Sequence, residues 1–452
     1  MKPSQHNTSL SVATTLAQVI DWSQQLARLH QRIAPRFARS QPRQRALAYL
    51  KGLLSPTERK SSWQLAEHAG EATPYGMQHL LADAVWDADL LRDDLRAYVI
   101  ECLGTQNAIL AIDETSFPKQ GQHSAGVKPQ WCGSTGQVEN CQVGVFLTYA
   151  TPQGHTLIDR ELYLPADWIA DRPRCQAAGI LDTRGFQTKP ELAITMLARF
   201  LQACPTLPLS WVVADSVYGG NPDLRAFLED RHLPYVLAVS SQEPVVVCLP
   251  DGSCRRLESG AVPELLGPAL RWQSLSMGEG TKGERLSDWA RLPLLHQGRD
   301  DGQHWLLIRR SHSDPSLFCF FLAFAPVGTS LQTMVAACGA RWHIEEDFEA
   351  AKDLGLDHYQ VRGFTPWYRH ITLVLLALAF LRGLCALSPS APAPPPALEL
   401  APLTPREIRR LLAQLLWPAP TSAPFVVGWS AWRRRHQCLA RFFHTQHRLH
   451  TG

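Results

Sequence analysis

The sequence predicts an α/β protein in which a mixed β-sheet is combined with helical segments before and after it. Two patterns predict this fold class. Three strand candidates follow one another between residues 107 and 164, and two more alternate with amphipathic helices between residues 189 and 239. The chain has 452 residues, of which 45% are hydrophobic and 19% charged, a composition typical of soluble globular proteins with more than one domain.

The first hundred residues are expected to be helical. Apolar residues recur three or four positions apart, with charged residues between them, as in the series Leu81, Ala84, Ala88, Leu91 and Leu95. This period places the apolar side chains on one face of a helix. Residues 1–104 are therefore predicted to form a helical N-terminal domain.

The strand candidates begin with Ala-Ile-Leu-Ala-Ile-Asp at residues 108–113, a short continuous apolar run that ends in a polar turn. Residues 142–150 and 155–164 are the next candidates, so a three-stranded meander is expected. A helix, a strand, a helix and a strand are then predicted at 189–203, 209–215, 222–231 and 235–239. This is the order of a ribonuclease-H-like core, whose first strand pairs within the meander and also with a later strand.

The rest of the chain changes in composition twice. Residues 241–328 are punctuated by Gly and Pro between short alternating runs, which predicts a β-rich insertion. Helices are expected to resume at residue 330, so that residues 329–387 complete the core begun at 105–240. The Pro-rich stretch 388–402 predicts a stiff linker, which separates off a basic C-terminal region at 403–452.

The net charge is only +3, so composition alone does not indicate a nucleic-acid partner. The basic residues are unevenly placed, however. Trp-Arg-Arg-Arg-His occupies residues 432–436, and a second basic run lies between Arg32 and Lys51. Both runs are suited to phosphate contacts. A solvated helix face is the alternative interpretation of each.

Cysteine usage and hydropathy bear on the cellular compartment. The 11 cysteines are scattered and contain no Cys-x-x-Cys pair, so neither a disulfide framework nor a tetrahedral zinc site is indicated, and a reducing cytoplasm fits best. The first ten residues lack the charged and apolar regions of a signal peptide, and the apolar run at 371–381 is too short to span a bilayer. We expect that run to be a buried helix and the protein to have no membrane partner.

Two aspartates stand at the ends of predicted strands. Asp113 closes one buried run and Asp215 closes another, so both side chains are expected to emerge where two strands end. On adjacent strands they would converge. A single carboxylate in such a place is more often a turn former or a helix cap, so neither residue alone indicates catalysis.

A third carboxylate lies on the predicted helix that contains Arg341. At about 100° per residue, Glu345 lies about 40° and Lys352 about 20° around the helix axis from Arg341, so all three share one face. An exposed helix with salt bridges four residues apart explains the Arg341–Glu345 pair equally well. Glu346 and Glu349 are the rival carboxylates, at about 140° and about 80°, and the spacing favours Glu345.

The spacing of Arg341, Glu345 and Lys352 resembles the core of the Tyr-Arg-Glu-Lys signature of bacterial insertion-sequence transposases of the DDE type. Further stretches are similar to the insertion-sequence-701 group of that superfamily. They include Asp-Glu-Thr-Ser-Phe-Pro-Lys at 113–119, Ala-Asp-Ser-Val-Tyr-Gly at 214–219 and Gly-Leu-Asp-His-Tyr-Gln-Val-Arg at 355–362. The resemblance covers most of residues 47–384.

The resemblance implies that Asp113, Asp215 and Glu345 are catalytic and bind two Mg²⁺ ions, with Mn²⁺ as a substitute. It also implies that Arg341 and Lys352 lie close to the DNA strand being cut. Such ions take hard oxygen ligands and keep several waters, so carboxylates suit them better than histidine or cysteine. The sequence departs from the signature at Cys338, where the family has a Tyr that helps to hold a terminal phosphate. The use of a hairpin intermediate is therefore left open.

The implied function is that of a DNA transposase: hydrolysis at a transposon end frees a 3′-hydroxyl, which then attacks target DNA. The expected partners are double-stranded DNA, as terminal inverted repeats and as target, and a second copy of the chain in a homodimer on paired ends. The N-terminal domain is the expected DNA-binding domain, in the bacterial cytoplasm with the nucleoid. Two alternatives stay open: a ribonuclease-H-like DNA nuclease without strand transfer, and a domesticated derivative that binds DNA without catalysis.

Further candidates for DNA contact are Lys119, Tyr218, Trp289, Arg433, Arg434 and Arg435. A purely structural explanation competes with DNA contact at several of them. Lys119 follows the first carboxylate and is also suited to a solvated loop. Tyr218 suits core support as well as base stacking, and Trp289 suits packing as well as contact with a flipped base.

Overall fold

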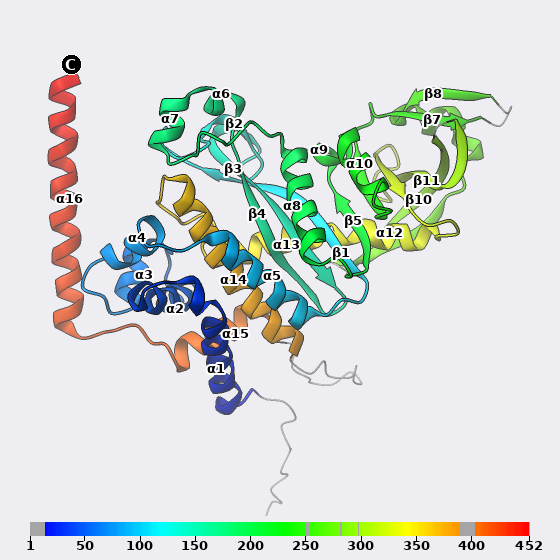
Figure 1. Cartoon of the computed structure of the whole chain (residues 1–452). Helices are drawn as coiled ribbons and strands as arrows, with labels where there is room; N and C mark the ends of the chain where they lie inside the picture. The colour runs from blue at the N-terminus through cyan, green and yellow to red at the C-terminus, as the bar shows by residue number, and fades with distance from the viewer. Residues whose placement is uncertain (1–13, 250–252, 281–282, 297, 388–402, 452) are drawn as a thin grey trace, which may run out of the picture.

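The computed structural model describes residues 14–249, 253–280, 283–296, 298–387 and 403–451. Its largest element is a ten-stranded mixed sheet. Figure 1 shows helices packed beside its strands, among them α5 (Ala88–Leu103), α8 (Lys189–Ala203) and α14 (Phe364–Leu387) next to β3 (Gln137–Thr151) and β4 (Gly154–Tyr163). This architecture confirms the predicted α/β class. The predicted Pro-rich linker at 388–402 lies outside the described residues.

The centre of the sheet is β1 (Ala108–Pro118), which is antiparallel to β3 (Gln137–Thr151) and parallel to β5 (Leu209–Ala214). On the outer side of β3 lies β4 (Gly154–Tyr163), and β6 (Tyr235–Val239) runs parallel to β5. The first strand therefore pairs both within the meander and with a later strand, as predicted. This arrangement brings the carboxyl end of β5 beside the middle of β1.

The chain after β6 continues the same sheet. β12 (Phe318–Phe324) pairs antiparallel with β6, and β11 (Arg299–Arg310), β10 (Gly283–His296) and β9 (Gln273–Gly280) follow outward in that order. β7 (Pro244–Cys248) and β8 (Cys254–Glu258) form a separate two-stranded sheet, and the short strand β2 (Lys128–Cys132), which the sequence did not predict, pairs with β3. One continuous sheet therefore joins the strands before residue 240 to the strands after residue 270.

Both faces of the core sheet are covered. β3 is buried without interruption from Cys141 to Ala150 and β4 from His155 to Leu162, a pattern that requires packing on both faces. One covering helix, α8 (Lys189–Ala203), begins with a capping box between Thr188 and Glu191 and with proline at its start, where proline needs no hydrogen-bond partner.

The most deeply buried helix is α14 (Phe364–Leu387), which packs against β4 and α5 (Ala88–Leu103). Among the described residues, it is the one helix long and apolar enough to cross a membrane, and 78% of its apolar window is buried inside the protein. The prediction of a buried helix at residues 371–381 is confirmed. The helix is longer than the apolar run at both ends, from Phe364 to Leu387, and its first turns contain aromatic and basic residues.

Helices account for the described part of the first hundred residues, as predicted: α1 (Leu16–Ile33), η1 (Ala34–Arg36), α2 (Ser40–Leu54), α3 (Ser62–His68) and α4 (Tyr75–Ala82), followed by α5. The other helical segments, in chain order, are α6 (Ala166–Ala170), α7 (Arg172–Ala177), α9 (Ser216–Gly219), α10 (Pro222–Glu229), η2 (Ser259–Ala261), α11 (Val262–Leu266), η3 (Gly267–Ala269), α12 (Leu331–Ala340), α13 (Trp342–Asp353), α15 (Pro405–Leu415) and α16 (Ala423–Thr451).

The C-terminal helix α16 lies beside α3 and α4 (Figure 1). Its Trp432 packs edge-to-face on Trp63 with ring centroids 4.7 Å apart, and the indole of Trp429 donates a hydrogen bond to the backbone oxygen of Glu71 at 2.9 Å. Helices α3 and α4 therefore pack against the first turns of α16, so segments from the two halves of the chain form one helical body.

Candidate active site

Asp113 lies inside β1 and not at its end, which corrects the expectation from sequence. The strand continues to Pro118 because it remains paired with β3, whereas its parallel pairing with β5 ends at Ile112 and Ala214. Asp113 is thus the first residue of β1 beyond the end of β5. Its carboxylate Oδ1 accepts the backbone N–H of Glu114 at 2.7 Å.

Asp215 directly follows β5, as predicted, and is the N-cap of α9. Its Oδ1 accepts a hydrogen bond from the backbone N–H of Val217 at 2.9 Å. The capping contact holds the side chain at the point where β5 turns away from the sheet. Two adjacent strands therefore deliver Asp113 and Asp215 to the same pocket.

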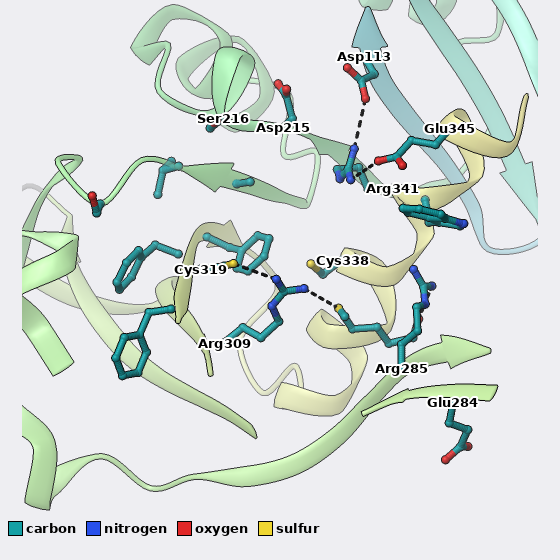
Figure 2. Close-up of a pocket in the computed structure, with 18 of the residues that line it drawn as sticks. Asp113, Asp215, Ser216, Glu284, Arg285, Arg309, Cys319, Cys338, Arg341 and Glu345 are labelled. Atoms are coloured by element: carbon teal, nitrogen blue, oxygen red, sulfur yellow. Dashed lines mark hydrogen bonds and ion pairs between the residues drawn. The ribbon is translucent and has the colours of Figure 1, made fainter. Parts of the chain in front are cut away.

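Glu345 comes from the first turn of α13, and Arg341 is the junction residue between α12 and α13. The predicted helix is therefore two helices, although the junction keeps helical backbone angles and the two residues still share a face. The Arg341 guanidinium donates to Asp113 Oδ2 at 3.2 Å and also to Glu345 Oε1. Figure 2 shows this guanidinium between the two carboxylates.

The carboxylates lie in an environment that disfavours their charged forms. Burial, together with the charges of Asp215 and Glu114, raises the pKa of Asp113 to about 7. Burial and the charge of Glu114 also raise the pKa of Asp215. Arg341 opposes both shifts but does not cancel them. A divalent cation would relieve this repulsion, and the hard oxygen donors of the set suit Mg²⁺ or Mn²⁺.

The pocket around the three carboxylates has a volume of about 910 Å³. Part of its wall comes from the segment between β6 and α12. Arg285 of β10 donates to the backbone oxygens of Met277 and Gly339, at 3.0 and 3.2 Å, and Arg309 of β11 donates to Cys319 Sγ at 2.9 Å. In Figure 2, Asp113, Asp215, Glu345 and Arg341 lie on one side of the pocket, and Arg285, Arg309 and Glu284 lie on the other.

No pattern in the sequence indicates these wall residues. Arg285 and Arg309 lie on neighbouring strands of a segment that carries no motif, and only the continuation of the sheet brings them to the carboxylates. Trp342, 42% exposed, also lines the pocket and was missed. Trp342 directly follows Arg341 in the sequence, which was the one indication that it could lie near the site.

Glu114 is a fourth acidic residue close to the site that sequence analysis missed. Its two carboxylate oxygens accept hydrogen bonds from Lys189 Nζ and from the Tyr218 hydroxyl, each at 2.6 Å. Tyr218 is fully buried, which favours core support over the alternative of base stacking. Glu114 directly follows Asp113 in the sequence, and this position was the one indication of its place near the site.

The rival third carboxylates point elsewhere. Glu346 Oε2 lies 3.2 Å from His155 Nε2 and 3.4 Å from His343 Nδ1, and Glu349 lines a different pocket together with Arg406 and Arg409. Among the three acidic candidates of α13, the pocket that contains Asp113 and Asp215 is lined by Glu345. Both the helical spacing and the tertiary structure therefore favour Glu345 as the third carboxylate.

The remaining candidates from the sequence lie outside the pocket wall. Lys119 packs with its Nζ 3.5 Å from the centre of the Tyr359 ring, and burial lowers its pKa to about 8. Lys352 is half-buried near the end of α13, two turns after Glu345. Trp289 is fully buried in β10 with its ring centroid 5.5 Å from that of Phe321, which favours the packing interpretation.

Cys338 does line the pocket, on α12 one turn before Arg341. Burial raises the pKa of its thiol to about 12, so it is neutral at physiological pH. Arg433, Arg434 and Arg435 lie on α16, the helix that packs beside α3 and α4. Arg433 pairs with Glu67 at 2.7 Å, whereas Arg434 and Arg435 are exposed.

The sequence and the structure were compared with those of known proteins. A family model described as DDE superfamily endonuclease matches residues 32–284, a range that contains Asp113 and Asp215 and ends before Glu345. A protein of Microchaete diplosiphon described as a probable transposase for insertion sequence element IS701 is 30% identical over 198 residues, which cover 43% of this chain and 48% of that protein. The chain thus spans about half the length of this curated relative.

Two solved structures align with the chain at low identity. The piggyBac transposase synaptic complex with hairpin DNA aligns with a TM-score of 0.44 and 13% identity, over 84% of this chain and 74% of that chain. The NurA nuclease from Sulfolobus solfataricus aligns with a TM-score of 0.23 and 9% identity, over 56% of this chain and 80% of that chain.

Proposed function

This chain belongs to the DDE superfamily endonucleases, and on that premise we propose that it is a DNA transposase that cleaves transposon ends and joins the freed 3′-hydroxyl to target DNA. The observation that carries the proposal is the presence of Asp113, Asp215 and Glu345 in the wall of one pocket. They come from a strand, the end of the neighbouring strand and a helix more than a hundred residues further along the chain.

The three carboxylates are proposed to hold two Mg²⁺ ions, with Mn²⁺ as a substitute. When bound, these ions would activate the attacking water or hydroxyl and neutralise the charge that develops at phosphorus. The fit rests on the donor set and on the raised pKa of Asp113, since closely spaced buried carboxylates need a cation to stay ionised together.

The basic residues of the pocket have distinct roles in this proposal. Arg341 occupies carboxylate oxygens that a cation would use, so its guanidinium turns away from Asp113 when cations bind. It then faces the phosphate of the strand being cut, which a planar guanidinium binds well. Arg285 and Arg309, on the opposite wall, would hold neighbouring phosphates of the same strand.

We also propose that the core is ribonuclease-H-like. The strand order β4, β3, β1, β5, β6, with its parallel β1–β5 pair, supports this assignment. We propose the following domains: an end-binding helical domain at 1–104, a core at 105–240 and 329–387, a β-rich insertion at 241–328, a linker at 388–402 and a basic tail at 403–452.

Double-stranded DNA is the proposed partner, both as terminal inverted repeats and as target. Cut-and-paste transposition handles two ends together, so a homodimer bridging paired ends is the proposed working unit, in the cytoplasm with the nucleoid. Exposed Arg434 and Arg435 support a DNA contact on α16.

The deciding experiment is an end-joining assay. Labelled duplexes that carry the DNA flanking the gene are incubated with the full-length protein, a supercoiled target plasmid and Mg²⁺ or Mn²⁺. The proposal expects cleavage at the end followed by covalent transfer of the label to the plasmid. Cleavage without transfer under every metal condition would identify a nuclease, and binding without cleavage would identify a derivative that has lost catalysis.

A further inference from the structure

A second cluster of metal-ligand side chains lies beside α13, separate from the three carboxylates. His155 of β4 meets His343 and Glu346 of α13, and one ligand atom from each lies within 4.8 Å of the others. Because His343 and Glu346 are three residues apart near the start of a helix, they project from one face toward the strand.

A buried carboxylate sets the orientation of His155. Asp347 is fully buried and accepts hydrogen bonds from Thr148 Oγ1 at 3.0 Å and Arg382 at 3.2 Å, and it lies 2.9 Å from His155 Nδ1. A carboxylate can only accept here, so Nδ1 carries a proton, and Nε2 faces Glu346. Burial lowers the pKa of His155, but Asp347 and Glu346 raise it by more, so a bound metal ion would displace the proton from Nε2 and take its lone pair. A carboxylate behind a histidine in this way is the usual outer contact of histidine metal ligands.

The distances within the cluster suit a small ion. Glu346 Oε2 lies 3.2 Å from His155 Nε2 and 3.4 Å from His343 Nδ1. Two ligand atoms bound to one tetrahedral zinc ion are about 3.4 Å apart, given bonds of about 2.1 Å. The two imidazole rings are stacked, with centroids 4.3 Å apart and planes at 19°, so the His343 ring must turn about its Cβ–Cγ bond to direct its lone pair at a shared ion.

The exposure of the cluster permits that movement and leaves a place for water. The His343 side chain is 37% exposed and the Glu346 side chain 43%, whereas that of His155 is 11% exposed. Two neutral imidazoles and one carboxylate are the ligands of many zinc sites with an open fourth position. They differ in kind from the all-oxygen set of the three catalytic candidates, which suits Mg²⁺.

We propose that His155, His343 and Glu346 bind one transition-metal ion, with zinc as the best match, and that Asp347 holds His155 for that purpose. The ion would tie the first turn of α13 to β4. Glu346 is adjacent to Glu345, so the ion would also hold the third carboxylate of the pocket in place. This last consequence rests on the proposed function, but the binding of the metal does not.

A second group, Glu229, His296 and His304, has similar composition and serves as the matched control. Its two rings are almost parallel, at 4°, and Glu229 already accepts the hydroxyl of Tyr235 at 2.6 Å. The distance from His304 Nε2 to Glu229 is 3.5 Å, longer than either corresponding distance in the His155 cluster. The geometry therefore favours the cluster on α13.

The test measures metal binding by the full-length chain after treatment with a chelator. Zn²⁺ and Co²⁺ are titrated into the wild type and the His343→Ala, Glu346→Gln and His296→Ala variants, followed by calorimetry and by the visible absorption of Co²⁺. With excess Mg²⁺ present to occupy the three carboxylates of the pocket, the wild type and His296→Ala should bind one Zn²⁺ per chain, with a four-coordinate Co²⁺ spectrum. His343→Ala and Glu346→Gln should each lose more than about tenfold in Zn²⁺ affinity.

Equal Zn²⁺ affinity in the wild type and His343→Ala would overturn the proposal, as would loss of binding in His296→Ala alone or no Zn²⁺ binding at all. A Glu345→Ala variant separates this site from the proposed function. It should lose DNA cleavage and keep its Zn²⁺. Circular dichroism verifies that each variant is folded, which is expected because His343 and Glu346 are partly exposed.

Discussion

The guanidinium of Arg341 donates a hydrogen bond to the carboxylate of Asp113 across 3.2 Å, although the two residues are 228 positions apart in the chain. The same guanidinium donates to Glu345. A permanent cation thus stands between the first and third carboxylates of the pocket, on oxygens that a divalent cation would need. Arg341 and the divalent cation are therefore competitors in the protein without DNA.

Removal of this competitor should strengthen metal binding and weaken catalysis. Arg341→Ala is expected to bind Mn²⁺ roughly tenfold more tightly in the absence of DNA, since a positive charge beside the ligands opposes a second cation. Cleavage of end DNA should nevertheless fall, because the phosphate loses its guanidinium. Electron paramagnetic resonance of free Mn²⁺ measures the first effect. Arg309→Ala, in the same pocket but without a carboxylate contact, is the control, and weaker Mn²⁺ binding by Arg341→Ala would contradict the prediction.

Loss of any one of the three carboxylates should abolish cleavage while end binding persists. Asp113→Ala, Asp215→Ala and Glu345→Ala are each expected to lower the cleavage rate by more than ~100-fold, because even outer contacts of a metal site contribute 10-fold or more. Gel-based cleavage with Mg²⁺ or Mn²⁺ gives the rate, and a mobility shift gives the binding. Glu349→Gln, one turn further along α13, should cleave normally. Full activity of Glu345→Ala would transfer the role to Glu346 or Glu349.

His370 should make the protein less stable in acid. Its Nε2 lies 2.9 Å from the backbone oxygen of Gly355 and its Nδ1 lies 2.7 Å from the Tyr49 hydroxyl, so the buried ring is held in its neutral form. Burial lowers its pKa from 6.5 to about 3. The unfolded chain takes up a proton below about pH 6.5 that the folded chain does not, so stability falls as the pH falls toward 3.

The expected contribution is up to about 1.4 kcal/mol per pH unit in that range, with none above it. Urea unfolding at a series of pH values measures the slope. His370→Gln should show a shallower slope below about pH 6.5 than the wild type. Parallel slopes for His370→Gln and the wild type would show that His370 titrates normally in the folded protein.

The two tryptophans near the pocket should respond differently to truncation. Trp289 is fully buried, so Trp289→Ala is expected to lower the free energy of unfolding by about 3–5 kcal/mol. Trp342 is 42% exposed in the pocket wall, so Trp342→Ala should change stability little and weaken DNA binding by about 1–3 kcal/mol if a base stacks on it. Chemical unfolding and fluorescence anisotropy separate the two effects. The opposite pattern would restore Trp289 as the DNA contact.

The exposed arginines of α16 should contribute electrostatic DNA affinity. The double variant Arg434→Ala/Arg435→Ala is expected to reduce the slope of log affinity against log salt by about 1.8, which corresponds to two lost phosphate contacts. Anisotropy titrations at several salt concentrations measure the slope. Arg433→Ala is the matched control, because its guanidinium pairs with Glu67 and should affect stability more than the slope. An unchanged slope in the double variant would assign α16 a role other than DNA contact.

Local patterns in the sequence determined much of the site. The apolar runs before Asp113 and Asp215 predicted two strands, and the helical spacing of Arg341 and Glu345 placed both residues on one face. The long apolar run likewise predicted the buried helix α14. These features depend on neighbouring residues, whose alternation or helical period is visible in the chain itself.

Only the tertiary structure decided which distant groups meet. The pairing of β1 with β3 keeps Asp113 inside a strand, and the continuation of the sheet from β6 to β12 brings Arg285 and Arg309 to the pocket. The contact between Arg341 and Asp113 and the burial of Trp289 arise in the same way. Strand pairing and side-chain burial depend on partners far away in the sequence, so no local period records them.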